Sequence, residues 1–309
     1  MTAAAPALRA LPAELAARPR AVAVVGALTI AFSSILVRLS HTTPSTSALF
    51  RCVYALPILA VLAWREDRRL GPRPVRDRRL ALAAGVFLGL DLLFWHRAIA
   101  DIGAGLGTVL ANIQVAAVPL VAWAVLGERP GRRLLAMLPV VVAGIVLISG
   151  ALEQGAYGRD PTAGAIFGVL TGLTYAGFIL VLRHSSADRR PPAGPLLDVT
   201  LAAAATTLAG GLVIGDLHFV PTWPGHAWLV TLALTSQIIG WLLISVSLPR
   251  LPAAIASMLL TIQPIGAVVL AAIIFGEDPT ALQVSGVVAL LVGVVVVART
   301  RSDPDPAPA

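Results

Sequence analysis

Two stretches of the chain decide the fold because they match each other: QVAAVPLVAWAVLGERP at residues 114–130 and QPIGAVVLAAIIFGEDP at residues 263–279. Both begin with glutamine, continue as an apolar run and end in Gly-Glu-x-Pro, at a constant offset of 149 residues. At that offset, nine identities fall within the 41 positions from 104 to 144. Alanine and leucine matches arise by chance in an apolar chain, whereas matched Gln, Glu and Pro do not. The sequence therefore predicts an internal duplication.

The composition around these stretches is that of a membrane protein. Of the 309 residues, 57% are hydrophobic and only 13% are charged, and the mean hydropathy is +0.86. Soluble domains carry about 25% charged residues, so this composition argues against a single soluble domain. The single cysteine, Cys52, excludes a disulfide framework and a thiolate metal cluster. We therefore expect no metal and no cofactor.

A membrane-spanning helix needs about 20 mostly apolar residues. Ten such spans are predicted, at residues 21–39, 44–63, 80–99, 103–126, 134–150, 162–182, 196–215, 226–247, 252–275 and 280–298. The domain organisation follows as a disordered cytoplasmic tail (1–20), a first repeat (21–150), an outer linker (151–161), a second repeat (162–299) and another disordered cytoplasmic tail (300–309).

The basic residues indicate the orientation of the spans. All 23 are arginines. With the N-terminus in the cytoplasm, 19 fall on the inner side, only Arg38, Arg97 and Arg159 on the outer side, and Arg51 within the second span. Cytoplasmic loops carry such an excess of basic residues. The formal charge of +7 therefore reports topology, with no nucleic-acid partner. Both termini are predicted in the cytoplasm, in a plasma (bacterial inner) membrane protein.

Each half contains five spans, and an odd number forces the second half to insert upside down. The charges agree: Glu128 is followed by Arg129, an inner signature, whereas the matching Glu277 is followed by Asp278. The predicted fold class is an all-α membrane protein with ten transmembrane helices in two inverted five-helix repeats. Inverted repeats recur in secondary transporters, with the substrate site near mid-membrane. The alternative is a duplication that only builds a stable bundle.

At these residues the chain resembles the drug/metabolite transporter superfamily, specifically the ten-helix group with two EamA domains, over about residues 21–299. That group has a proline thirteen residues before the Glu, which Pro264 matches, whereas Val115 replaces it in the first half and Pro119 follows four residues later. A bend in the fourth helix is then expected at a different depth. Arg51 matches an arginine near the start of the second helix in the group. The resemblance implies an inner-membrane carrier that exports amino acids or other small metabolites.

Ionisable residues inside a membrane are functional candidates by default. Asp91 lies about eleven residues into the third span, and Trp95 is one turn on, on the same face. We expect Asp91 to bind a substrate amine or to couple transport to protons. The alternative is an ion pair with Arg51 at a similar depth, and both roles are compatible. Arg51 has the further alternative of extending to the outer headgroups.

Polar stripes recur at matching positions of the two halves. Thr108 and Asn112 correspond to Ser257 and Thr261, either lining a polar cavity or allowing close helix packing. Gln114 and Gln263 lie about 200° around the helix from Asn112 and Thr261. We therefore slightly favour a hydrogen bond between the two glutamines, linking the repeats, over substrate contact. Structural roles between the repeats are also expected for Glu128, Glu277, Pro119 and Pro264.

Further candidates for the cavity wall lie in other spans. Gln237, Trp241 and Ser245 share one face of the eighth span, Tyr175 is near the middle of the sixth, and Ser33 is near the middle of the first. The two tryptophans Trp95 and Trp241 either shape a site for an amphipathic or aromatic substrate or serve packing. Glycines spaced four apart predict a close-packing face on the sixth span; they are Gly164, Gly168 and Gly172. His96 is expected near the outer surface without a chemical role.

No phosphate-binding G-x-x-x-x-G-K-[ST] loop, HExxH or GxSxG motif occurs. We therefore predict a protein that is not an enzyme and that works as a secondary active transporter, an exporter of amino acids or amphipathic small metabolites, with proton coupling as one option. Its partners would be a small-molecule substrate, the lipid bilayer and protons. A membrane-embedded enzyme or lipid-handling protein is the alternative; it would need a carboxylate or histidine cluster at one membrane face. The scarcity of charge in the spans favours neutral, zwitterionic or amphipathic substrates.

Overall fold

The computed structural model describes residues 18–185, 192–247, 251 and 253–300, without the side chains of 183–185, 253–261 and 298–300. Those ranges contain α-helices and one π-helical segment and no strand. The helices are α3 (Pro19–Leu39), α4 (Pro44–Leu70), α5 (Val75–Ile102), α6 (Ala104–Ala111), α7 (Gln114–Leu126), α8 (Arg132–Ile148), α9 (Pro161–Ser185), α10 (Ala193–Ile214), α11 (Gly225–Leu232), η1 (Ala233–Gly240), α12 (Trp241–Ser247), α13 (Ala253–Phe275) and α14 (Ala281–Thr300). The predicted tails lie almost wholly outside the described residues.

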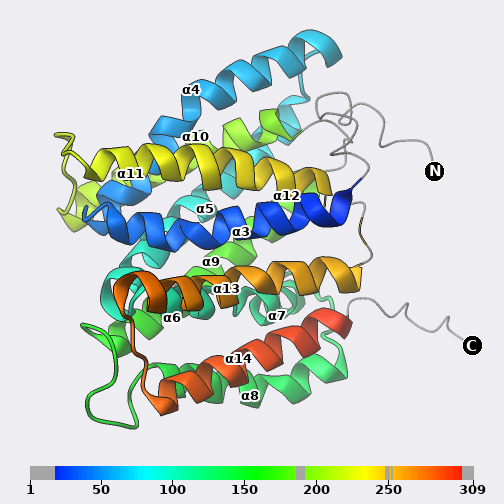
Figure 1. Ribbon diagram of the computed structural model, residues 1–309. Helices are drawn as coiled ribbons and strands as arrows, with labels where there is room; N and C mark the ends of the chain where they lie inside the picture. Colours follow the sequence, from blue (N-terminus) through cyan, green and yellow to red (C-terminus); the bar gives the residue numbers. More distant parts are fainter. Residues whose placement is uncertain (1–17, 186–191, 248–250, 252, 301–309) are drawn as a thin grey trace, which may run out of the picture.

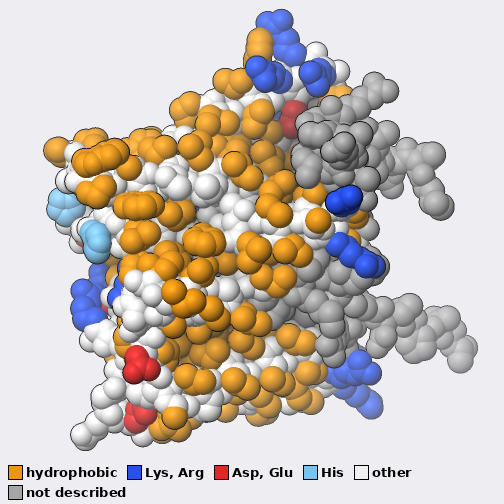
Figure 2. Space-filling view, viewed as in Figure 1, with side chains coloured by type: hydrophobic (Ala, Val, Ile, Leu, Met, Phe, Trp, Pro, Cys, Tyr) orange, Lys and Arg blue, Asp and Glu red, His pale blue; other side chains and the backbone are white. Residues whose placement is uncertain are grey.

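Each of the ten predicted spans corresponds to a helical segment of the described chain, with α6–α7 and α11–η1–α12 each forming one segment. Seven segments are long and apolar enough to cross a membrane, and α13 and α14 add the shorter apolar stretches Ile262–Phe275 and Ala281–Val297. The surface agrees, because hydrophobic side chains cover the middle of the molecule and most arginines gather at its ends (Figure 2). A soluble protein does not expose so broad an apolar surface. The protein is a multi-pass membrane protein.

Helices α4 and α5 are longer than the predicted spans 44–63 and 80–99. Each continues through arginine-rich sequence, because arginine is a good helix former once the chain has left the apolar layer. Helix α4 ends where Gly71 adopts a positive φ of 79°, which only glycine does without strain. Apolar content alone therefore underestimates helix length at a membrane surface.

The helices form a bundle in which α8 and α14 pack together at one side and α4 and α10 at the other (Figure 1). Between these pairs, α5 packs on α9 and α10, and α3 packs on α13 and on the α11–η1–α12 segment. Helix α3 begins and α14 ends at the same end of the bundle (Figure 1). We call this end the N-terminal face and the other end the opposite face.

Helix α6 gives way to α7 at Asn112 and Ile113, near the middle of the fourth span. The backbone N–H of Asn112 bonds the carbonyl of Val109 and that of Ile113 bonds Leu110, which is a 3₁₀ pattern. The Asn112 side chain donates to the Thr108 carbonyl at 2.8 Å, taking the acceptor that an α-helical N–H would use. The break therefore lies seven residues before Pro119, which sits inside α7.

The π-helical segment η1 makes the eighth span irregular. A π-helix has i→i+5 hydrogen bonds, so a uniform α-helical spacing does not hold across Ala233–Gly240. Gln237 and Trp241 both lie toward the interior, whereas Ser245 is exposed. The shared face predicted for all three residues is therefore wrong for Ser245.

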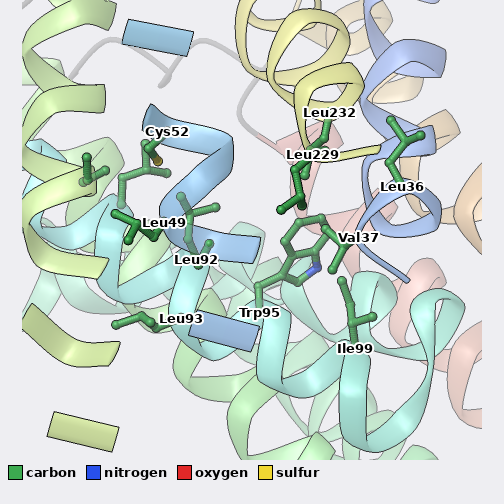
Figure 3. Packing of buried hydrophobic residues seen from close by; sticks show 14 of the residues in the cluster. Leu36, Val37, Leu49, Cys52, Leu92, Leu93, Trp95, Ile99, Leu229 and Leu232 are labelled. Carbon is green, nitrogen blue, oxygen red and sulfur yellow. The ribbon is translucent and has the colours of Figure 1, made fainter. Parts of the chain in front are cut away.

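The largest apolar cluster of the described residues includes Trp95 and side chains from helices of both halves of the chain. In Figure 3 the indole points toward Val37 of α3 and Leu229 of α11, with Leu92 and Ile99 on its own helix. The predicted close-packing glycines of α9 face α5, α6 and Ile113 just after α6: a Cβ on Gly164 would lie 2.6 Å from the Cβ of Ile102. These contacts hold α5, α6 and α9 close together around the centre of the bundle.

Candidate functional site

A cavity of about 360 Å³ lies at the centre of the bundle. Both halves of the chain contribute to its wall, through α3 to α7 from the first half and α9, η1, α12, α13 and α14 from the second. Its polar and aromatic wall residues are Ser33, Arg51, Asp91, Trp95, Thr108, Asn112, Gln114, Thr171, Tyr175, Gln237, Trp241 and Gln263. A pocket of this size accepts a small metabolite.

The structure brings eight of the ten predicted cavity residues to this one wall; they are Ser33, Asp91, Trp95, Thr108, Asn112, Tyr175, Gln237 and Trp241. The side chains of Ser257 and Thr261 lie outside the described residues. Ser33 contributes a hydroxyl oxygen that is buried and makes no hydrogen bond to the described residues.

Asp91 is the carboxylate of the cavity and is 6% exposed. The ion pair with Arg51, the alternative considered for Asp91, is not formed: no arginine nitrogen of the described residues lies within 4.0 Å of its oxygens. The physical reason is that the Arg51 guanidinium is held by other partners. The Asp91 carboxylate is therefore placed to interact with a solute in the cavity.

Arg51 is 4% exposed, so it is buried and does not extend to the membrane surface. Its Nη2 donates a 3.0 Å hydrogen bond to Oε1 of Gln237, and Gln237 donates to the Thr200 hydroxyl at 3.3 Å. Its guanidinium carbon lies 5.7 Å from the centre of the Trp95 ring. These contacts, from α5, η1 and α10, fix a cation in the wall of the cavity.

His96 is the residue that sequence reasoning missed. Its side chain is 1% exposed, with Nδ1 2.6 Å from the Ser47 hydroxyl and Nε2 3.4 Å from Nη1 of Arg51. It lies three residues before the end of the predicted third span (80–99), a position that suggested an outer location. His96 lies five residues after Asp91 on the same helix. That spacing did not indicate a role for His96, because its hydrogen-bond partners lie on another helix.

The aromatic part of the wall comes from α9 and α12. Tyr175 and Trp241 stack with ring centres 6.5 Å apart and an interplanar angle of 29°. Phe178 packs edge-on against the same indole at 5.9 Å. These rings present a flat apolar surface, while Asp91 and Arg51 supply a negative and a positive charge. The cavity thus suits a small solute with both charges and an apolar part.

Gln114 and Gln263 both line the cavity, and the expected hydrogen bond between them is not formed. Oε1 of Gln114 is buried without a partner among the described residues. The expectation failed because it counted 100° per residue from Asn112 to Gln114, whereas the chain leaves the α-helix between them. The break turns Thr108, Asn112 and Gln114 toward one cavity.

Glu277, for which a structural role between the repeats is expected, contacts the first half of the chain. Its carboxylate accepts hydrogen bonds from the backbone N–H of Ala104 at 2.7 Å and of Gly105 at 3.1 Å, and it pairs with Arg38. Glu277 therefore caps the N-terminus of α6 at the opposite face. Its counterpart Glu128 is exposed at the N-terminal face, and Pro264 is buried within α13.

A second cavity, of about 460 Å³, lies toward the opposite face. Its polar wall residues are Arg38, Thr42, Ser47, His96, Asp101, Tyr157 and Arg159. Asp101 pairs with both Arg97 and Arg159. The arginines predicted for the outer side are thus each paired with a carboxylate.

The comparisons with known proteins agree with this architecture. A solved structure titled only "Crystal structure of protein" is similar with a TM-score of 0.60 and 15% identity, covering 93% of this chain and 98% of that chain. At that identity the likeness shows the fold alone. A search of curated proteins gave no match. A sequence model described as the EamA-like transporter family matches residues 20–150 and 162–299. The resemblance is thereby confirmed: the chain carries two EamA segments and belongs to the EamA-like transporter family.

Proposed function

We propose that this protein is a secondary active transporter that exports small amphipathic or zwitterionic metabolites, amino acids among them, across the plasma membrane. The observation that carries the proposal is the central cavity, where Asp91 and Arg51 stand in one wall with the rings of Tyr175 and Trp241. A substrate ammonium would bind Asp91 and a carboxylate would bind Arg51. The aromatic rings would cover an apolar side chain.

We further propose that the halves are inverted repeats that alternate between two states. Under the 149-residue offset, α3 corresponds to α9, α4 to α10, α5 to α11–η1–α12, α6–α7 to α13, and α8 to α14. The packing supports this, because α4–α10 and α8–α14 join equivalent helices. The other main contacts occur in exchanged pairs: α3 on α13 matches α9 on α6 and α7, and α5 on α9 matches α11–η1–α12 on α3.

In the proposed orientation the N-terminal face is cytoplasmic, as the arginine distribution predicts. The cavity wall extends toward that face, since Ile244 lies three residues from the end of α12. At the opposite face, Glu277 joins α13 to α6. This arrangement corresponds to a cavity that takes up its substrate from the cytoplasm. Asp91 also offers a place for a proton, which would couple export to the proton gradient.

The test is flux in proteoliposomes that contain the purified full chain. A panel of radiolabelled amino acids and small aromatic zwitterions is applied, with and without an imposed proton gradient. Saturable flux of at least one zwitterion, competed by others, is the expected result. Gradient-driven accumulation that collapses with a proton ionophore supports coupling. Absence of saturable flux across the panel, with protein of intact thermal stability, would contradict the proposed substrate class.

A further inference from the structure

The two cavities approach each other at one pair of side chains. His96 is in the wall of the 460 Å³ cavity, and Arg51 is in the wall of the central cavity. The nitrogen atoms that face each other, Nε2 of His96 and Nη1 of Arg51, are 3.4 Å apart. Trp95 lies against both, with its ring centre 5.3 Å from that of His96. These residues stand between the two spaces.

The hydrogen bonds of His96 define its protonation and tautomer. An arginine guanidinium only donates, so Nε2 of His96 must accept from Arg51 and carries no proton. The proton is then on Nδ1, which donates to the Ser47 hydroxyl at 2.6 Å. Ser47 in turn donates to the carbonyls of Thr43 at 3.1 Å or Pro44 at 3.0 Å. A neutral His96 thus connects the start of α4 to the cavity arginine.

We propose that His96 is a positioning residue for Arg51, and that the two side chains form the partition between the central cavity and an exit cavity toward the outer face. The proposal rests on the proposed function only in naming the second cavity as part of the export route. Arg51 is held by Gln237 from one side and by His96 from the other. Release of the His96 contact frees the guanidinium to move and joins the two cavities.

Substitutions at His96 separate positioning from simple packing. His96→Gln supplies an amide oxygen at about the reach of Nε2, so it keeps an acceptor for Arg51. His96→Leu has a similar bulk and no acceptor, and it leaves a buried guanidinium N–H unpaired, which costs stability and order. His96→Ala also opens space between the cavities. Ser47→Ala removes the acceptor that holds the tautomer while leaving Arg51 and the wall of the central cavity unchanged.

The partition is tested by thiol labelling in a Cys52→Ala background, which removes the single cysteine. Ala111→Cys places a thiol in the central cavity and Ala100→Cys places one in the second cavity. A membrane-impermeant thiol reagent is added to the outer side of sealed vesicles. We expect the cavity thiol to react about tenfold faster with His96→Ala than with His96 or His96→Gln. The thiol at 100 reacts equally in all three and is the matched control.

A second variant that opens the partition serves as a control in case His96→Ala misfolds. Arg51→Ala removes the other half of the partition and should give the same increase in labelling at position 111. Thermal unfolding in detergent identifies variants that have lost their fold. Equal labelling rates at position 111 in His96, His96→Gln, His96→Ala and Arg51→Ala, all folded, would overturn the partition. This outcome is independent of any substrate, so it does not depend on the flux assay.

The positioning role is tested by flux of a zwitterion that the transporter moves. His96→Leu is expected to raise KM about tenfold, with His96→Gln restoring it to near the wild-type value and Ser47→Ala giving an intermediate effect. A loss that is equal for Gln and Leu, with unchanged thermal stability, would show that the acceptor does not matter and would overturn the role. If no zwitterion is moved by the wild type, the proposed function fails instead, and the labelling result still stands.

Discussion

Asp91 is the residue on which substrate binding is expected to depend most. Replacement by Asn keeps its size and removes the charge that would pair with an ammonium group. A hydrogen bond to a charged group contributes about 1.5–3 kcal/mol, so Asp91→Asn should raise KM for zwitterions by about tenfold to a hundredfold. Flux in proteoliposomes measures this, and Asp278→Asn, an exposed acid at the opposite face, is the matched control. Wild-type KM and pH dependence in Asp91→Asn would contradict the role.

Arg51 provides a second prediction, because its planar group has partners in three directions. Arg51→Lys keeps the charge, yet an ammonium group cannot contact Gln237, His96 and the Trp95 ring together in the same geometry. We expect flux to fall about tenfold while the fold remains. Arg129→Lys, at an exposed position between α7 and α8, should change flux by less than a factor of about two. Equal flux in both variants would show that only the positive charge matters.

Some residues of the candidate site could be predicted from the sequence and others could not. Asp91, Gln237 and Trp241 could be identified because charged and polar groups are costly in a membrane and therefore stand out. His96 could not, since its importance comes from contacts with Ser47 and Arg51, 49 and 45 positions away in the sequence. The choice between the alternatives for Arg51 stayed open in the sequence for the same reason. Depth in the membrane can be counted along a helix, whereas the direction of a side chain depends on the packing of its neighbours.

At the scale of elements, helix α6 needs a cap because Gly103, with φ 95°, separates it from α5. Its first N–H groups would otherwise lack acceptors. Glu277→Ala removes the carboxylate that accepts from Ala104 and Gly105, so it should destabilise the protein by about 1–2 kcal/mol and lower the melting temperature. Glu277→Gln should lose less, because one acceptor remains. Asp278→Ala, next in sequence and exposed, is the control, and an equal melting temperature for both alanine variants would contradict the cap.

The number and order of the helical segments could be predicted because apolar length is read directly from the sequence. The irregularities could not. The break at Asn112 depends on a side chain that bonds the Thr108 carbonyl, and η1 has no composition that distinguishes it from an α-helix. Both irregularities adjoin the cavity, where they direct Gln114 and Gln237 into its wall. Side-chain directions predicted from regular α-helices are therefore wrong at the cavity wall, where the helices are irregular.

For the whole molecule, the orientation in the membrane follows from the arginines and can be tested on its own. The described arginines of the N-terminal face lie mostly at the end of α4, the start of α5 and the start of α8, whereas Arg38 and Arg159 of the opposite face are each paired with a carboxylate. Because arginine-rich segments stay on the cytoplasmic side of a membrane, the N-terminal face should lie inside.

In a Cys52→Ala background, Leu152→Cys should react with an impermeant maleimide in intact cells. Leu152 is a 64% exposed residue of the loop before α9. Gly131→Cys, exposed between α7 and α8, should react only after permeabilisation. The reverse pattern would place the termini outside, and with it the second cavity would face the cytoplasm and the proposed export route would run the other way.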